Sequence, residues 1–162
     1  MPGTRLVLVL LALLTPVTVA CSDRGDEGRL RKERWIEQAD ELCKDEKASL
    51  GELEPPDADP FDESLGSDQL AEIATYLEAS LEIQDDLTQK LDDLDLPADD
   101  AGDIETVLDR RVDGAAAVAL AIDAAQAGDT KDFVAAYRTA ATEYSKASQR
   151  ARDFGLEECG QP

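Results

Sequence analysis

The sequence predicts an all-α protein: an up-down-up-down four-helix bundle that follows an N-terminal signal peptide and is tied by one disulfide. Three observations predict it. Beyond residue 20, apolar residues recur at steps of three and four, the period of an amphipathic helix. Alternating runs rich in Val, Ile and Thr, typical of strands, are missing from the same region. Short connections between three of the predicted helices favour antiparallel neighbours.

The first helix is predicted over residues 30–50. Gly51 and the pair Pro55-Pro56 end it, and an acidic loop follows over residues 52–66. Its apolar stripe consists of Ile36, Ala39, Cys43 and Leu50. In a bundle of this topology part of the segment 29–40 is expected to project beyond the other helices.

The second helix is predicted to start at Ser67 as its N-cap and to run for about 28 residues, until Pro97 stops the chain. The third is predicted to begin near Asp103. Its run of alanines after Gly114 allows a neighbouring helix to approach closely. Arg111 lies near the apolar face of this helix, where we expect it to pair with an acidic residue of the second helix.

The fourth helix has the clearest pattern. Gly128 is the predicted C-cap of the helix before it, and Asp129 or Thr130 the N-cap of this one. Gly155 is expected to end the helix. Steps of four and three produce a heptad seam, made of Phe133, Tyr137, Ala140, Tyr144, Ala147, Ala151 and Phe154.

The N-terminus has the layout of a secretory leader. Arg5 precedes the unbroken apolar run of residues 6–14, and small residues lead to Cys21. Residues 1–20 are therefore predicted to be a lipoprotein signal peptide, residues 21–29 a flexible tether and residues 30–162 the bundle domain. A transmembrane anchor is the alternative, but the apolar stretch is shorter than the roughly 20 residues that spanning needs.

The three cysteines have different expected fates. "TVAC", ending at Cys21, resembles the lipobox of bacterial lipoproteins, although Thr18 stands where that motif usually has Leu. The resemblance implies an acylated Cys21, palmitate-type chains included; loss of Cys21 from an ordinary secreted protein is the alternative. Cys43 and Cys159 then remain to pair in an oxidising compartment, with two buried free thiols as the other possibility.

"ADELC", residues 39–43, and "FGLEECG", residues 154–160, resemble the two ends of small actinobacterial lipoproteins of largely uncharacterised function. These are helical proteins of similar length with one cysteine early and one near the C-terminus. The resemblance implies a fold and a location at the outer face of the cytoplasmic membrane. It implies no established activity.

Composition excludes several functions. The formal net charge is -21, and removal of residues 1–20 takes away only one charged residue, Arg5, which leaves -22. Nucleic acid is not an expected partner, because binding it needs a basic surface. The chain has no histidine, which excludes His-based catalysis and the usual zinc sites. We expect no catalytic residues, no metal and no cofactor, although the acidic residues near Asp99 leave calcium binding open.

A basic cluster stands out in this acidic chain: Arg29, Arg31, Lys32 and Arg34. Close to an acylated Cys21, these side chains are expected to lie near the headgroups of anionic lipids. The alternative is that they pair with Glu33 and Glu37 on the first helix. The predicted function is a lipid-anchored, non-enzymatic binding module of the cell envelope, whose partner is an unknown envelope protein or small ligand. Alternatives are a carrier of a small apolar ligand between the helices, or a carboxylate-based enzyme.

Overall fold

The computed structural model describes residues 23–161, with side chains from residue 27 onward. The predicted signal peptide and Cys21 lie outside the described residues. Four α-helices make up the fold: α1 over Asp23–Gly51, α2 over Ser67–Asp92, α3 over Ala101–Gln126 and α4 over Thr130–Phe154. No strand occurs within residues 23–161, so the predicted all-α class is confirmed.

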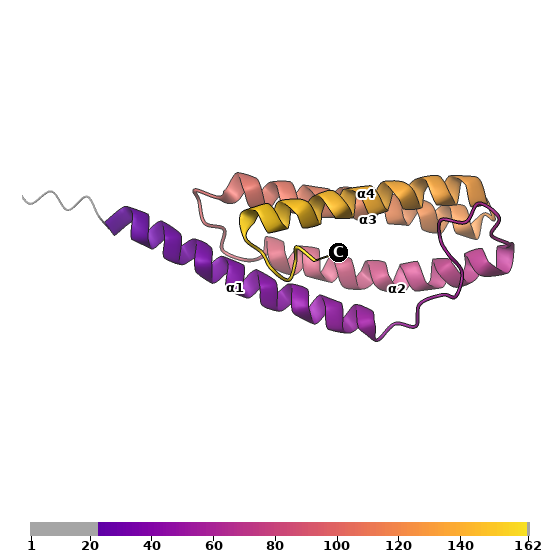
Figure 1. Ribbon diagram of the computed structural model, residues 1–162, viewed down its shortest axis with the longest axis horizontal. Helices are drawn as coiled ribbons and strands as arrows, with labels where there is room; N and C mark the ends of the chain where they lie inside the picture. The colour runs from indigo at the N-terminus through magenta and orange to yellow at the C-terminus, as the bar shows by residue number, and fades with distance from the viewer. Residues whose placement is uncertain (1–22, 162) are drawn as a thin grey trace, which may run out of the picture.

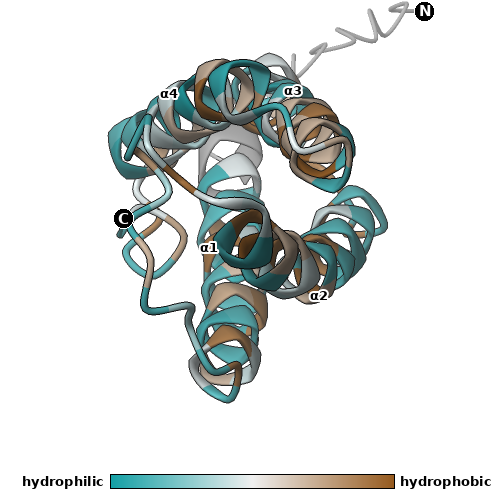
Figure 2. Ribbon diagram, turned by 90° about the vertical axis from the view of Figure 1, so that its right-hand side faces the viewer, coloured by the Kyte–Doolittle hydropathy of each residue, from teal (hydrophilic) through white to brown (hydrophobic). Residues whose placement is uncertain are grey.

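The helices alternate in direction along the chain, which confirms the up-down-up-down topology (Figure 1). In the end-on view α3 and α4 lie side by side, with α1 and α2 across the bundle from them (Figure 2). The N-terminal part of α1 projects beyond the other three helices (Figure 1). Within residues 23–161, no helix has the length and apolar character needed to cross a membrane.

The ends of α4 follow directly from the local sequence. The Asp129 carboxylate accepts a hydrogen bond from the backbone N–H of Asp132 at 3.0 Å, which satisfies one of the free donors in the first turn. Gly155 ends the helix with φ 107°, a left-handed conformation that favours glycine over other residues. Both predictions at these positions are confirmed.

The start of α2 differs from the prediction by one residue. The N-cap is Gly66, and Ser67 is the first helical residue. The side chain of Gln69 accepts a hydrogen bond from the backbone N–H of Gly66 at 2.9 Å. A side chain reaching back from the third helical position satisfies this donor, so the cap does not need the Ser67 hydroxyl.

The predicted start of the first helix is wrong. α1 begins at Asp23 rather than at residue 30, so the segment predicted to be a flexible tether is helical from residue 23. Gly25 and Gly28 indicated flexibility in the sequence. Against them, no proline interrupts α1, and a glycine within a helix costs only about 1 kcal/mol.

The core divides into two clusters along the bundle. The first, which we call the four-helix half, takes residues from all four helices and the C-terminal tail: Trp35, Ala39, Cys43, Leu87, Leu91, Ile104, Val107, Leu108, Ala151, Phe154 and Leu156. The second, the three-helix half, takes residues from α2, α3, α4 and the loop before α2, and none from α1: Leu65, Leu70, Ile73, Ala74, Leu77, Ala117, Val118, Ala121, Ile122, Ala125, Phe133, Val134 and Ala140.

The loop of residues 52–66 covers the core of the three-helix half, to which α1 contributes no residue. Leu65 is buried in that core, and the Thr130 hydroxyl donates to the Leu65 carbonyl at 3.0 Å. The Phe61 ring lies edge-on to Tyr137, with 5.1 Å between centroids. A loop covers less apolar surface than a helix, and Phe61 remains 44% exposed.

Candidate functional site

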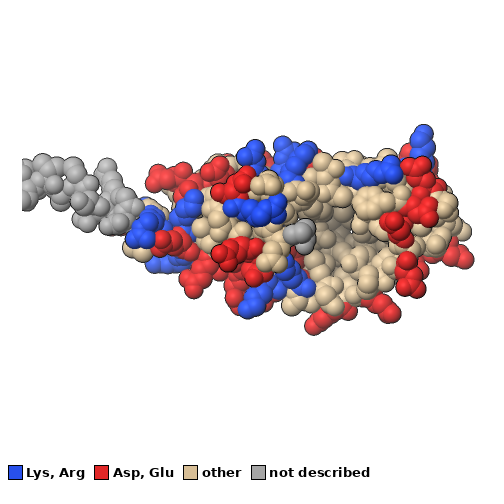
Figure 3. Space-filling view, viewed as in Figure 1, with Lys and Arg blue, Asp and Glu red and all other residues tan. Residues whose placement is uncertain are grey.

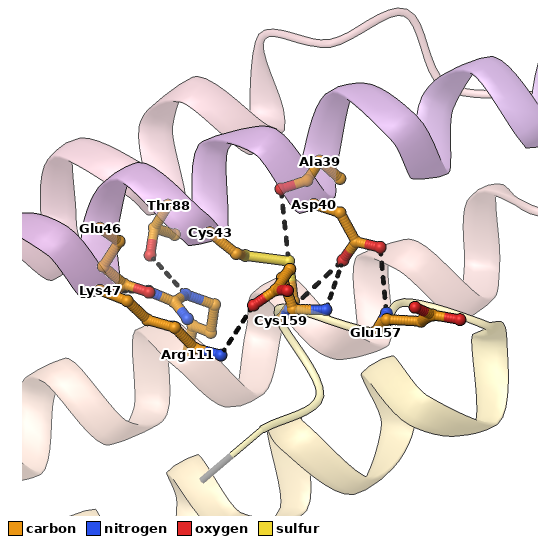
Figure 4. The surroundings of a disulfide bond; sticks show 10 residues. Ala39, Asp40, Cys43, Glu46, Lys47, Thr88, Arg111, Glu157 and Cys159 are labelled. Carbon is orange, nitrogen blue, oxygen red and sulfur yellow. Dashed lines mark hydrogen bonds and ion pairs between the residues drawn. A yellow bond between two sulfur atoms is a disulfide. The ribbon is translucent and has the colours of Figure 1, made fainter.

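A buried ion pair lies within the bundle. Arg111 of α3 donates from Nη2 to the Glu46 carboxylate of α1 at 2.6 Å, and from Nε to the Thr88 hydroxyl of α2 at 3.1 Å (Figure 4). Both charged side chains are only 11% exposed. Arg111 forms an ion pair as predicted, but its acidic partner belongs to the first helix and not, as predicted, to the second.

Tyr144 of α4 brings the fourth helix to the same region. Its ring packs against Gly114 of α3, where a Cβ atom would come within 3.0 Å of the ring carbons. Burial raises the pKa of Tyr144 to about 12; the nearby carboxylates of Asp85 and Glu46 add to this, and Arg111 opposes it. The Tyr144 hydroxyl therefore stays protonated over the physiological pH range.

A small cavity of about 30 Å³ adjoins these groups in the four-helix half. Trp35, Arg111, Tyr144 and Ser148 are among its lining residues. Within the described residues, the Trp35 indole N–H and the Tyr144 hydroxyl are the two buried side-chain groups with no hydrogen-bond partner. A cavity of this size has room for about two water molecules, and ordered water is the usual partner of such groups. It is too small for an apolar ligand, since ligand pockets are typically about ten times larger.

The disulfide predicted from the cysteine count is present. Cys43 of α1 bonds to Cys159 of the tail, with 5.1 Å between their Cα atoms (Figure 4). The Asp40 carboxylate, one turn earlier on α1, accepts hydrogen bonds from the backbone N–H groups of Glu157, Glu158 and Cys159 at 2.9 to 3.3 Å.

This role of Asp40 was not predicted, although Asp40 is part of the "ADELC" stretch that ends at Cys43. The ion pair between Lys47 and Glu158, at 3.1 Å, adds a further link between α1 and the tail. Covalent, ionic and hydrogen-bonding contacts thus fasten the C-terminal tail to one face of α1.

The structure divides the basic cluster into two pairs of residues. Arg29 forms an ion pair with Glu33 at 2.7 Å. Lys32 contacts Asp100 at 3.0 Å and lies 3.9 Å from the centre of the Phe154 ring.

Arg31 and Arg34 differ from that pair. Both are exposed, and both line a crevice of about 550 Å³ on the side of α1 that faces Asp95 and Leu96. Part of the predicted basic surface is therefore used within the fold, and part is open to solvent.

The acidic residues do not gather into an evident metal centre. Across residues 23–161, no group of three or more His, Cys, Asp or Glu side chains is arranged to hold a metal ion. Among the described residues, hydrogen bonds hold the pKa values of two carboxyl groups below their ordinary range. Hydrogen bonds lower the pKa of Asp62, chiefly through Ser64, and that of Glu143, chiefly through Lys146 and Arg110.

The geometry of the buried groups indicates a structural role. The ion pair has its hydrogen bonds satisfied, and any other alignment of the helices would leave Arg111 or Glu46 buried without its partner. Such pairs can specify one register among several that an alanine-rich interface would otherwise tolerate. The four-helix half thus combines a fixed register with a small cavity whose lining is mostly apolar, with a few polar groups. Comparison with protein-family models, with curated proteins and with solved structures found no match for this chain.

Proposed function

We propose that this protein is exported, anchored by a lipid on Cys21 at the outer face of the cytoplasmic membrane, and acts as a non-enzymatic binding module of the cell envelope. The observation that carries the proposal is the bond between Cys43 and Cys159. Disulfides are typical of oxidising compartments outside the cytoplasm. Because the bond uses two of the three cysteines, Cys21 is left for acylation after its lipobox-like sequence.

The binding-module part of the proposal is supported by how the interior is filled. Apolar side chains occupy both halves of the bundle, and the cavity of about 30 Å³ does not accommodate an apolar ligand. A partner would therefore meet the outer surface. This disfavours the alternative of a carrier that holds its cargo between the helices.

The alternative of a carboxylate-based enzyme has less support. A carboxylic acid that donates a proton near neutral pH needs a raised pKa. The two described carboxyl groups with shifted pKa values, Asp62 and Glu143, are shifted down, as expected for charged groups that accept hydrogen bonds. The resemblance to small actinobacterial lipoproteins stays a prediction and implies the same location.

The anchoring proposal is tested by fractionation of a bacterial host that processes lipoproteins. The parent protein is expected in the membrane fraction, labelled by an alkyne fatty acid. The Cys21→Ser variant is expected to lose the label and to appear in the medium or the soluble envelope fraction. Ser22→Ala, which changes the neighbouring residue, serves as the control and should behave like the parent. Membrane retention of unlabelled Cys21→Ser would contradict lipid anchoring.

The binding role is tested separately with the anchored protein. Chemical crosslinking in cells, followed by purification of the anchored chain, is expected to enrich one envelope protein above the level seen with an unrelated lipoprotein of equal abundance. Enrichment that is the same for both baits would contradict a specific protein partner.

A further inference from the structure

The crevice beside α1 brings two exposed basic side chains together. Its lining consists of Arg31, Arg34, Trp35, Gln38, Asp95 and Leu96. Arg31 and Arg34 are three residues apart on α1 and therefore neighbours on one helix face. Within the part of the chain that the structure describes, neither arginine forms an ion pair or a side-chain hydrogen bond.

Charge sets this crevice apart from the rest of the molecule. Its lining carries two positive charges and one negative charge, on Asp95, whereas the chain beyond residue 20 has a net charge of -22. Figure 3 shows Lys and Arg side chains at the projecting end of α1, beside the grey N-terminal atoms. The lining of the crevice is thus locally positive on an otherwise acidic molecule, which favours the approach of an anion.

The donor groups match one ligand chemistry. Guanidinium groups form forked, charge-assisted hydrogen bonds with phosphate oxygens. The Gln38 amide adds an uncharged donor, and Trp35 and Leu96 supply apolar contact beside it. The other two basic residues of the cluster are less suited to this role, because Arg29 pairs with Glu33 and Lys32 with Asp100.

We infer that the crevice formed by α1 and residues 95–96 binds a phosphate group through Arg31 and Arg34, either that of an anionic lipid headgroup or that of a soluble phosphate compound. The inference rests on the proposed function for its first source, since lipid anchoring is what would bring the crevice to a membrane surface. Arg31 and Arg34, rather than the whole basic cluster, are then the contacts with the ligand.

The test uses residues 22–162 without an acyl chain, so that its result does not depend on Cys21. Every residue of both core clusters lies between Trp35 and Leu156, so this chain keeps the complete fold. Binding is measured by co-sedimentation with phosphatidylcholine vesicles that contain or lack phosphatidylglycerol. A second titration uses inorganic phosphate, with the fluorescence of Trp35, the one tryptophan of the chain, as its signal.

The variant Arg31→Gln with Arg34→Gln is expected to bind phosphatidylglycerol vesicles about 30-fold more weakly than the parent, the effect of removing two basic groups at an anionic surface. Lys44→Gln with Lys131→Gln makes the same change in net charge at two exposed positions away from the crevice and should keep parental binding. Both variants change exposed helical side chains, and circular dichroism checks that their helix content is unchanged.

Each outcome has a defined meaning. Phosphatidylglycerol-dependent binding that the arginine variant loses supports a lipid headgroup as the ligand. Phosphate-induced fluorescence change that the same variant loses, without a vesicle preference, supports a soluble phosphate compound. Absence of both signals in the parent, or an equal loss in the lysine control, overturns the inference. None of these results depends on whether Cys21→Ser is released from cells.

Discussion

The apolar cores of the two halves of the bundle are covered by different elements, a helix in one half and a loop in the other. The four-helix half is closed by α1 and fastened by the disulfide, the Asp40 carboxylate and the buried pair of Arg111 with Glu46. The three-helix half is closed by a loop that contributes one buried side chain, Leu65, to the core.

The two halves therefore differ in how they are held together: the covalent and ionic links between helices are concentrated in the four-helix half. The fastened half also contains the cavity of about 30 Å³ and the unpartnered indole N–H of Trp35. Tyr144, whose hydroxyl is also unpartnered, lines this cavity and packs against the core of the three-helix half. The loop-covered half is filled largely by small and aliphatic side chains. Covalent and ionic links can hold a partly imperfect interface together, whereas an interface without them depends on close packing.

Removal of the disulfide should have the largest effect on this comparison. For Cys43→Ala with Cys159→Ala we expect a loss of about 4.8 kcal/mol in the free energy of unfolding, the chain-entropy value for a loop of this length. The measurement is urea denaturation followed by Trp35 fluorescence, which reports on the four-helix half. The parent under reducing conditions is the control and should match the variant. An unchanged midpoint on reduction would show that non-covalent contacts alone fasten α1.

The second largest effect is expected from separating the buried ion pair. Arg111→Met leaves Glu46 buried without its partner and should cost about 3 kcal/mol. Arg110→Met is the matched control: Arg110 lies next in sequence, but its side chain is 41% exposed and pairs with Glu143 near the surface, so its loss should cost less than about 1 kcal/mol.

A double variant separates charge from packing. Glu46→Leu combined with Arg111→Met removes both charges and should be more stable than Arg111→Met alone, because no unpaired charge remains buried. Thermal denaturation of the three variants gives the comparison. Equal stability of Arg111→Met and the double variant would mean that the two side chains stabilise the fold through packing and not through their charges.

A third pair of variants compares the two halves directly. Leu156 covers the four-helix half and Leu65 the three-helix half; both lie outside the helices and both are buried. We expect Leu156→Ala to cost about 3 kcal/mol and Leu65→Ala about 2 kcal/mol, since a truncation costs more where the surroundings cannot collapse into the space. The tail at Leu156 is held by the disulfide, whereas the loop at Leu65 can move inward. A larger cost for Leu65→Ala than for Leu156→Ala would contradict the conclusion that the four-helix half is held more firmly.

The smallest effect is expected at alkaline pH. The pKa of Tyr144 in the folded protein is raised from 10.0 to about 12, so the unfolded chain releases this proton first. The contribution of Tyr144 is complete below pH 10 and is lost as the pH rises towards 12. Tyr144→Phe should therefore show a smaller decline in stability between pH 10 and 12.

Tyr137→Phe provides a second measurement, at a tyrosine that packs against the three-helix half and does not line the cavity. Burial raises the pKa of Tyr137 as well, with smaller contributions from Tyr76 and Asp59. We expect the same kind of change as for Tyr144→Phe but a smaller one. Identical pH profiles for the parent and Tyr144→Phe would contradict the buried, protonated hydroxyl.

Properties that depend on local sequence were predictable. Helical periodicity and capping residues predicted four helices, their order and most of their ends, and Gly155 marked the end of α4. The cysteine count predicted the bond between Cys43 and Cys159. The start of α1 was not predictable in the same way, because Gly25 and Gly28 lower helix propensity without preventing a helix.

The candidate site depended on contacts that a single sequence does not encode visibly. The pairing of Arg111 with Glu46 joins positions 65 residues apart, and many acidic side chains on two helices were equivalent candidates. The close approach of Tyr144 to Gly114 depends on how two helices are rotated about their axes. The division of the basic cluster likewise follows from where Asp100 and Phe154 lie in space.

The bond between Cys43 and Cys159 also determines how the molecule would respond to mechanical force. The two cysteines are 116 positions apart, and all residues between them belong to one covalent loop. If the chain were pulled between Cys21 and Pro162, tension would run along α1 to Cys43, cross the sulfur atoms and leave through the last few residues. Helices α2, α3 and α4 would bear no load, and only the first part of α1 and the tail could extend until the bond was reduced.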